Sequence, residues 1–335
     1  MPLNHGGQLN QVAAGSAIPQ DDWLDLSTGI SPFAYSVANI PAKYWQALPH
    51  VPDSLIEIAK HYYQAKNCIA CAGSQSIIEK LPELWKRHCG WAKLKSKRVY
   101  LPLVGYKEHE LAWQQAGFEI CYYQSSLPAV IAPFAVVVVV NPNNPSGQIY
   151  QQNELLELQE KVKLADGLLV IDEAFMDVIQ PSQSMAQYCD EANTLILKSF
   201  GKFFGLAGLR IGFVCGSDFW LSQLKRNLSP WSVNGPALYI AEQALADSSW
   251  QQMQKERLAE QVEQMLPFLE TSFQPVKISY TSLFITLYLN QAEQVYQKLC
   301  KLGIYVRLTD EKDALRFGIA DKKALAILKI RLSDS

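Results

Sequence analysis

The chain has 335 residues, 49% of them hydrophobic, so it is long enough to bury a large core and to form two domains. Its formal net charge is −2 with no long run of either sign, which argues against nucleic-acid and membrane partners. The most apolar run, residues 129–140, is too short for a membrane span. No secretion signal begins the chain, and its seven cysteines, an odd number, favour a cytoplasmic location over a disulfide framework.

Between residues 97 and 216, segments typical of strands alternate with segments typical of helices. Strands are predicted at 97–103, 119–123, 135–140, 167–172, 194–199 and 210–216, and helices at 106–117 and 152–164. The valine run in 135–140 is typical of a strand covered on both faces. We therefore predict an α/β fold with a mostly parallel central sheet and helices on both faces.

From about residue 235 the pattern changes to that of a smaller α+β domain. Helices are predicted at 236–247, 250–271 and 291–302, strands near 275–280, 282–289, 304–308 and 314–319, and a last helix beginning at Asp321. We expect three parts: an N-terminal arm that packs with the small domain (1–38), a large domain (39–235) and a small C-terminal domain (236–335).

Cys68 and Cys71 form a C-x-x-C sequence. A zinc or redox site needs further ligands, and only His88 and Cys89 lie anywhere near in sequence. We interpret these cysteines as small buried thiols, with metal or redox chemistry as the less favoured alternative and no metal expected.

Three groups of different chemistry follow three predicted strands. They are the Asn-rich segment 141–147, the carboxylate of Asp172 and the amine of Lys202. Ligands of open α/β sheets bind at the carboxyl ends of the strands, so these groups are expected to form one site. Taken singly, the lysine could be a stem reaching solvent, the aspartate a helix cap and the asparagine segment an ordinary turn.

Two phosphate-binding patterns are excluded. The residue after Lys202 is Phe203 rather than the Ser or Thr of a Walker loop, and no G-x-G-x-x-G joins a strand to a helix. Pyridoxal phosphate accounts for the whole set, because it needs an amine to bond, an acid beside its ring nitrogen and donors for its phosphate.

The segment SFGKFFGLAGLRIGF, residues 199–213, resembles the S-x-x-K…G-L-R-x-G signature of the fold-type I aminotransferase superfamily, and the similarity extends over nearly the whole chain. The resemblance implies the fold-type I pyridoxal-phosphate-dependent transferase fold. It identifies Lys202 as the catalytic Schiff-base lysine, and Ser199 and Arg210 as ligands of the cofactor phosphate.

Other segments extend this resemblance. NPNNPSG is similar to the family's N-P-x-G turn and VIDEAF to its D-E-A-[YF] segment, which imply Asn144 beside the ring oxygen and catalytic Asp172 at the ring nitrogen. The predicted helix start at Ser74 and Gln75 offers backbone N–H groups for the phosphate, with little role for the Gln75 side chain. The resemblance also implies that the ring of Tyr106 stacks on the cofactor.

Residues 4–9, 24–33, 229–237 and 247–252 resemble one branch, the L-threonine-O-3-phosphate decarboxylases of cobalamin biosynthesis. Their product is (R)-1-amino-2-propanol O-2-phosphate. The substrate-binding residues that this resemblance implies are Arg316 for the α-carboxylate, His5 and Arg307 for the phosphate, the backbone of Gly29 and Ile30, and Asn144.

Two positions depart from the transaminase pattern. Phe175 stands where many transaminases have a tyrosine that bonds the ring oxygen, which agrees with the decarboxylase branch. Val51 stands where relatives often have a tyrosine that reaches the cofactor phosphate of the partner subunit, so that contact of the expected homodimer is left open.

We expect a decarboxylase acting on a small phosphorylated amino acid. The alternatives are an aminotransferase acting on histidinol phosphate or another amino acid, and a non-catalytic regulator that binds pyridoxal phosphate. Decarboxylation and transamination differ in which bond stands perpendicular to the cofactor ring, and the residues do not show that torsion.

Overall fold

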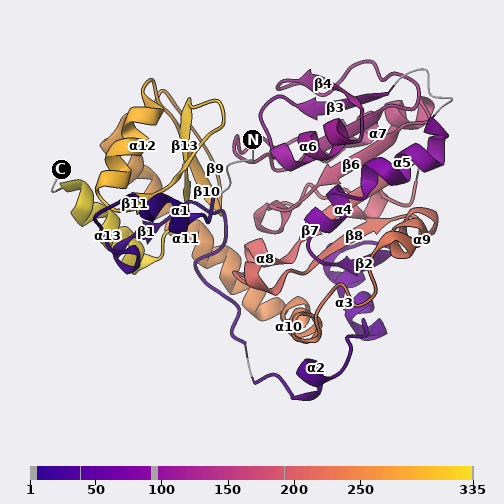
Figure 1. Cartoon of the computed structure of the whole chain (residues 1–335), viewed down its shortest axis with the longest axis horizontal. Coiled ribbons are helices and arrows are strands. Elements are labelled where there is room, and N and C mark those ends of the chain that lie inside the picture. The colour runs from indigo at the N-terminus through magenta and orange to yellow at the C-terminus, as the bar shows by residue number, and fades with distance from the viewer. Residues whose placement is uncertain (1–5, 38, 92–96, 192, 334–335) are drawn as a thin grey trace.

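The computed structural model describes residues 6–37, 39–91, 97–191 and 193–333. Figure 1 shows a larger body with a wide sheet and a smaller body, which the long helix α11 (Ser248–Phe273) joins. His5, which we expected at the substrate phosphate, lies outside the described residues. Among the described residues, no helix is both long enough and apolar enough to cross a membrane.

The larger body is built on a seven-stranded sheet whose order is β2-β8-β7-β6-β5-β3-β4. Its strands are β2 (Cys68–Cys71), β3 (Arg98–Pro102), β4 (Glu119–Tyr123), β5 (Val136–Val140), β6 (Leu168–Asp172), β7 (Thr194–Ser199) and β8 (Gly212–Gly216). β8 runs antiparallel to both neighbours and the other pairings are parallel. The carboxyl ends of β5, β6 and β7 therefore meet at one edge of the sheet.

The C-x-x-C sequence is an edge strand of this sheet, which we did not predict. Cys68 pairs with Cys215 and Cys71 with Gly212 across β2 and β8. Burial raises the pKa of both Cys68 and Cys71 to about 12, so both thiols stay protonated at neutral pH. The segment has a structural explanation as a buried edge strand.

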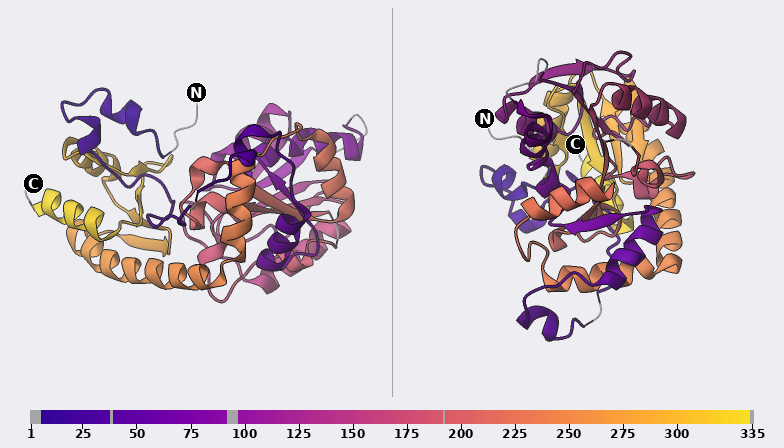
Figure 2. Two further views of the ribbon diagram at one scale, coloured as in Figure 1. Left: turned by 90° about the horizontal axis from the view of Figure 1, so that it is seen from below. Right: turned by 90° about the vertical axis from the view of Figure 1, so that its right-hand side faces the viewer.

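Helices cover both faces of the sheet, as Figure 2 shows from two further directions. On one face lie α3 (Asp53–Tyr63), α7 (Gln152–Leu164) and α10 (Gly235–Ala246), and on the other α4 (Gln75–Ile78), α5 (Leu81–Cys89), α6 (Lys107–Gln115) and α9 (Asp218–Asn227). Side chains alternate along each strand, so Ile171 and Ile196 join the first core, whereas Val170 and Leu197 join the second.

The smaller body contains a four-stranded antiparallel sheet in the order β12-β13-β10-β9. Its elements are β9 (Lys277–Thr281), β10 (Phe284–Tyr288), α12 (Ala292–Lys301), β11 (Ile304–Tyr305), β12 (Arg307–Leu308), β13 (Ala314–Gly318) and α13 (Lys322–Ser333). As expected, Asp321 caps the last helix, because its Oδ1 accepts a hydrogen bond from Ala324 N at 2.7 Å.

The N-terminal arm crosses between the two bodies. It contains α1 (Leu9–Ala13), a 3-10 turn (Gln20–Asp22) and β1 (Leu24–Asp25), which pairs with β11 of the smaller body. Further on, α2 (Lys43–Gln46) contacts α10 beside the large sheet. The division at residues 38/39 and 235/236 stays a prediction, and α10, which we assigned to the small domain, packs against α2 and α3.

Candidate active site

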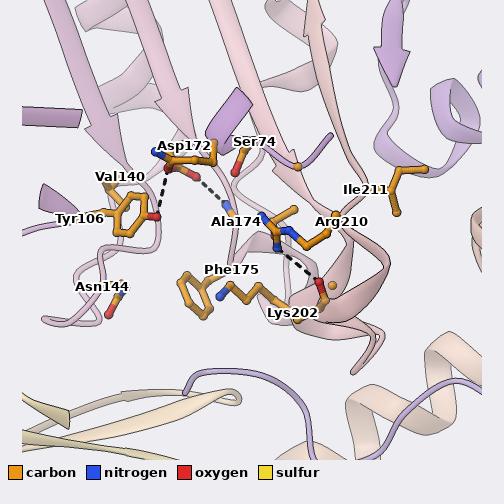
Figure 3. A pocket seen from close by; sticks show the side chains of 15 residues that line it. Ser74, Tyr106, Val140, Asn144, Asp172, Ala174, Phe175, Lys202, Arg210 and Ile211 are labelled. Carbon is orange, nitrogen blue, oxygen red and sulfur yellow. Dashed lines mark hydrogen bonds between the residues drawn. The ribbon is translucent and has the colours of Figure 1, made fainter. Parts of the chain in front are cut away.

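A cavity of about 140 Å³ lies at the carboxyl ends of β5, β6 and β7 (Figure 3). The structure brings all eight residues that we predicted to bind the cofactor to its wall. They are Ser74, Gln75, Tyr106, Asn144, Asp172, Ser199, Lys202 and Arg210. These residues come from five separate segments of the chain, so the sheet edge has assembled them as its topology predicts.

Lys202 lies on the short helix α8 (Phe200–Phe203), which begins directly after β7. Its Nζ is 5.7 Å from the centre of the Phe175 ring. Burial and the positive charges of Arg316, Arg210 and Arg307 together lower the pKa of Lys202 to about 8, against the opposing pull of Asp172. The amine therefore loses its proton far more easily than a lysine in water, as a nucleophile requires.

Asp172 ends β6 and is 3% exposed. Its Oδ1 accepts a hydrogen bond from Ala174 N at 3.1 Å, and its Oδ2 lies 2.9 Å from Nε2 of His109. His109 is 1% exposed, and its other ring nitrogen has no partner among the described residues. Both carboxylate oxygens are thus held, and the side chain has one orientation toward the cavity.

The sequence reasoning missed His109. It lies three residues after Tyr106 at the start of α6, and residues at that spacing share a helix face. Their rings lie 6.1 Å apart and nearly perpendicular. The spacing was therefore the available signal, but it identifies no partner without the fold that brings Asp172 beside it.

Another part of the cavity wall combines a helix start with a guanidinium. Ser74 stands at the beginning of α4, where the first N–H groups have no carbonyl partner within the helix. A Cβ added to Gly73 would lie 3.2 Å from Nη2 of Arg210, and one added to Gly212 would lie 3.0 Å from Ser74 N. Only glycine permits this close approach, which concentrates anion-binding groups at one point.

The side chain of Gln75 does more than we expected. Its Oε1 accepts a hydrogen bond from the hydroxyl of Tyr106 at 3.2 Å. Its Nε2 donates to Glu108 at 3.1 Å and to Glu79 at 3.2 Å. The two carboxylates fix which way the amide faces, so Gln75 presents its oxygen to Tyr106 and helps to hold the ring at the cavity wall.

Two arginines of the smaller body face the same region. Arg307 on β12 stands opposite Arg316 on β13, and Arg316 donates hydrogen bonds to Oδ1 of Asn144 and to the carbonyl of Ser27. The Nε atoms of both guanidiniums are buried without a partner among the described residues. Burial and the charge of Arg307 lower the pKa of Arg316 to about 9. This pair of partly satisfied cations is suited to anionic ligands.

Phe175, whose identity departs from the transaminase pattern, also lines the cavity. Its ring is 4% exposed and packs edge-on against Phe284, with centroids 5.1 Å apart. A Cβ on Gly29 would lie 2.8 Å from the Phe175 ring, so the arm passes close over it. Ile30 is the next residue of the N-terminal arm. Val51 packs against the hydrophobic core of its own chain.

The N-terminal arm is hydrogen-bonded directly to α8, the helix that carries Lys202. Ser31 N donates to the backbone carbonyl of Lys202 at 2.9 Å. Gln254, a fully buried residue of α11, donates through Nε2 to Ser31 Oγ at 2.6 Å and to the carbonyl of Phe203 at 3.1 Å. One amide therefore joins the long helix, the arm and the helix that carries Lys202.

The donor set fits pyridoxal phosphate. A lysine of lowered pKa, a fixed carboxylate and an anion cradle line one cavity, with the aromatic ring of Tyr106 at its wall. Each corresponds to one chemical part of the cofactor: its aldehyde, its ring nitrogen, its phosphate and its ring face.

Comparison with known proteins identifies the family. The sequence matches Aminotransferase class I and II over residues 46–325. The chain belongs to this family. It is 36% identical to a threonine-phosphate decarboxylase from Pseudomonas aeruginosa over 98% of this chain and 97% of that protein, and 33% identical to one from a Sinorhizobium species over 96% and 95%.

Solved structures show the same fold. Histidinol-phosphate aminotransferase from Sinorhizobium meliloti, solved in complex with pyridoxal-5'-phosphate, superposes with a TM-score of 0.80, 16% identity and coverage of 100% of this chain and 95% of that one. The L-threonine-O-3-phosphate decarboxylase from Porphyromonas gingivalis gives 0.73 and 17%, with 92% and 98% covered. The predictions of the family and of the fold-type I fold are confirmed.

Proposed function

We propose that this protein is a pyridoxal-phosphate-dependent decarboxylase of L-threonine O-3-phosphate in cobalamin biosynthesis. The observation that carries the substrate is the pair Arg307 and Arg316, two guanidiniums side by side whose buried Nε atoms have no partner in the part of the chain that the structure describes. Two such cations beside the Lys202 cavity suit an amino acid that bears both a carboxylate and a phosphate. The names of the two relatives, similar over nearly their whole length, support the same reaction.

The roles of the site residues follow from their positions. Lys202 would bond the cofactor aldehyde, Asp172 would hold the ring nitrogen protonated, and Ser74, Ser199 and Arg210 would hold the phosphate. Bound pyridoxal phosphate supplies the electron sink for negative charge that develops at the substrate's α-carbon. Tyr106 would stack on its ring, and the backbone of Gln75 would add a phosphate donor.

Substrate orientation falls to the other residues. Arg316 would grip the α-carboxylate and Arg307 the phosphate, while Asn144 and the backbone of Gly29 and Ile30 would contact the substrate between them. Anchoring the substrate at two points would fix the rotation about its Cα, so that the C–C bond to the carboxylate stands perpendicular to the plane of the cofactor ring. The electron pair of that bond would be left at Cα as CO₂ departs, and Lys202 Nζ would supply the proton that takes the place of the carboxylate, which gives (R)-1-aminopropan-2-yl phosphate.

A side-by-side assay tests this reaction. O-phospho-L-threonine alone should release CO₂ without any 2-oxo acid, and histidinol phosphate with 2-oxoglutarate should give little glutamate, because histidinol phosphate has no carboxylate for Arg316. Rapid glutamate formation in the second mixture with no CO₂ in the first would replace the decarboxylase with the aminotransferase.

The same assay with Arg307→Ala tests the phosphate contact. Loss of one charge-assisted contact, about 1.5–3 kcal/mol, should raise KM for O-phospho-L-threonine roughly 10- to 150-fold. The weak activity toward threonine, which lacks the phosphate, should change much less. An equal change for both substrates would remove Arg307 from the phosphate site.

We propose a cytoplasmic homodimer. Three large side chains are mostly exposed: Trp45 (65%), Leu48 (68%) and Trp231 (61%). The segments that carry them adjoin, because a Cβ on Gly235 would meet the backbone of Tyr44. A second copy of the chain would cover this apolar area, which is costly to leave in water.

Light scattering of the purified protein should give twice the chain mass, and Trp45→Glu should shift it toward monomer. A monomer at micromolar concentration for the unmodified chain would contradict the dimer.

The seven free cysteines support the proposed cytoplasmic location, because thiols stay reduced in a reducing compartment.

A further inference from the structure

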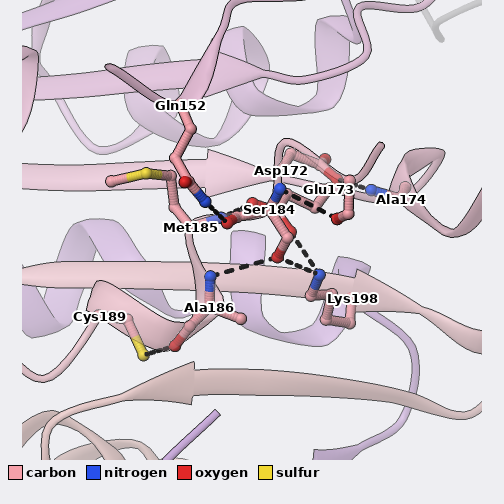
Figure 4. Close-up of polar contacts among 10 residues, drawn as sticks. Gln152, Asp172, Glu173, Ala174, Ser184, Met185, Ala186, Cys189 and Lys198 are labelled. Atoms are coloured by element: carbon pink, nitrogen blue, oxygen red, sulfur yellow. Dashed lines mark hydrogen bonds and ion pairs between the residues drawn. The ribbon is translucent and has the colours of Figure 1, made fainter. Parts of the chain in front are cut away.

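Beneath the candidate active site, a lysine and a glutamate form a buried ion pair (Figure 4). Lys198 is 2% exposed and Glu173 is fully buried. Nζ of Lys198 contacts Oε2 of Glu173 and donates a hydrogen bond to Ser184 Oγ at 2.9 Å. Two ionised groups so far from water need compensation from their surroundings.

That compensation is complete for the carboxylate. Ser184 Oγ donates to Oε2 of Glu173 at 2.6 Å, and Met185 N donates to its Oε1 at 2.8 Å. Burial lowers the pKa of Lys198, but the charges of Glu173 and Asp177 raise it by more, so the net direction is upward and the ammonium keeps its proton. The pair is therefore a fixed contact in which Lys198 carries its positive charge.

Both members of the pair adjoin residues of the cavity wall. Glu173 follows Asp172 and Lys198 precedes Ser199, and side chains alternate between the two faces of a strand. Lys198 accordingly lies on the core face of α3, with Nζ 5.1 Å from the centre of the Tyr63 ring, whereas Asp172 and Ser199 line the cavity.

The pair also joins two strands where their ladder ends. β6 ends at Asp172 and a 3-10 turn (Met176–Val178) follows, so the backbone bond from Glu173 N to Leu197 O, 2.9 Å long, is at the end of the β6–β7 pairing. Beyond it the side-chain contact between Lys198 and Glu173 joins the two strands. An apolar pair could fill the same space, often without loss of stability. It would not hold the two strand ends in one relative orientation, because apolar contacts are not directional.

We propose that the Lys198–Glu173 ion pair, with Ser184, is a positioning device for the cofactor site. It holds the ends of β6 and β7 together from the far face of the sheet, so that the Asp172 carboxylate and the Ser199 hydroxyl keep the separation that bound pyridoxal phosphate requires. The inference rests on the proposed function, because the cofactor contacts of Asp172 and Ser199 belong to that proposal.

The double variant Lys198→Met/Glu173→Gln tests the pair. Glutamine can still accept from Met185 N and can donate to Ser184 Oγ, so both charges disappear while these hydrogen bonds remain possible. We expect apo-protein thermal stability near that of the wild type. The dissociation constant of pyridoxal phosphate should rise about tenfold or more, and kcat should fall by up to about a hundredfold with little change in KM, as small displacements of reacting groups produce.

A matched control makes the same substitutions at an exposed pair. Lys163 and Glu160 lie 3.4 Å apart on α7, with side chains about half exposed. Lys163→Met/Glu160→Gln should leave the cofactor affinity, the absorbance spectrum of bound cofactor and turnover unchanged. A shift in both double variants would make the effect a general one of lost charge and would overturn the proposal.

Three outcomes decide the matter. A folded Lys198→Met/Glu173→Gln protein with wild-type cofactor affinity, spectrum and kcat would show that the pair has no positioning role. If that variant fails to fold, Ser184→Ala, which removes only the bridging hydroxyl, must weaken cofactor binding in the folded protein, and unchanged binding would refute the inference. If the wild-type protein binds pyridoxal phosphate but does not turn over O-phospho-L-threonine, the proposed substrate is refuted and the positioning role still stands.

Discussion

Lys198 lies in β7 and Lys202 four residues later in α8, and their surroundings shift the pKa values of the two amines in opposite directions. Burial lowers the pKa of both. At Lys198 the carboxylates of Glu173 and Asp177 outweigh burial, and the pKa is raised. At Lys202 the guanidiniums add to burial, and the pKa falls to about 8.

The difference shows that burial alone does not decide what a lysine does. The surrounding charges turn one ammonium into a permanent structural cation and make the other a ready source of free amine. Substitutions at the two lysines and at the groups around Lys202 test this contrast and the site that depends on it, with effects that range from the loss of turnover to a few-fold change.

Lys202→Ala should remove covalent attachment of pyridoxal phosphate and reduce turnover by more than about a thousandfold, because Lys198 is fixed on the other face and cannot replace it. The bound cofactor's visible absorbance should be lost. In the wild type, borohydride reduction should fix the label to one peptide, and mass spectrometry should locate it at Lys202. A label on Lys198 or any other lysine would overturn the contrast.

Asp172→Asn should retain stoichiometric cofactor but lose about a thousandfold in kcat. An amide cannot hold the ring nitrogen protonated, and about 4 kcal/mol less transition-state stabilisation corresponds to that factor. Steady-state kinetics together with cofactor titration measure both quantities. Near-normal kcat at full cofactor occupancy would remove Asp172 from this role.

The pH dependence of cofactor attachment measures the pKa of Lys202 directly. In apo protein mixed with pyridoxal phosphate, the attachment rate should rise with pH to a midpoint of about 8 rather than the ordinary 10.5, because only the neutral amine reacts. Arg316→Met should raise that midpoint most, since Arg316 is the strongest of the charges acting on Lys202, and Arg307→Met should raise it less. A wild-type midpoint near 10.5 would contradict the lowered pKa.

The lowered pKa of Lys202 also makes the stability of the folded chain depend on pH. The folded chain binds fewer protons at Lys202 than the unfolded chain between about pH 8 and 10.5, so this residue's contribution to stability rises with pH across that window.

His109→Phe should give the smallest effect. It removes one hydrogen bond to Asp172 and leaves the one from Ala174 N, so a net loss of about 1 kcal/mol would lower kcat roughly fivefold. His109→Gln, which keeps a donor, should recover part of that loss. An unchanged kcat in His109→Phe would show that the 2.9 Å contact does not act on catalysis.

The sequence predicts best where chemistry lies in one contiguous segment. Lys202 and Arg210 belong to one motif, and Asp172 and Asn144 follow strands whose valine- and leucine-rich runs are easily predicted, so these residues could be named and then found at one cavity. Their segments have a fixed strand-to-turn geometry, and the parallel sheet brings such strand ends together.

Contacts that depend on strand direction or on distant segments could not be predicted. The period of β8 does not reveal that it runs antiparallel, and the cysteines of β2 resemble a metal motif more than a strand. The bonds of Gln254 reach Ser31 and Phe203, residues remote in sequence with no shared pattern. The Lys198–Glu173 pair likewise exists only because β6 and β7 are neighbours.

The bond from Ser31 to the carbonyl of Lys202 gives the N-terminal arm a place in the active site. Gln254 of α11 holds the arm there, so the arm, α8 and α11 are joined by one small group of hydrogen bonds. A protease that clipped the arm near Ser31 would therefore not merely trim a tail. It would remove the hydrogen bond that holds the backbone of Lys202, so cleavage near the N-terminus would lower catalytic activity.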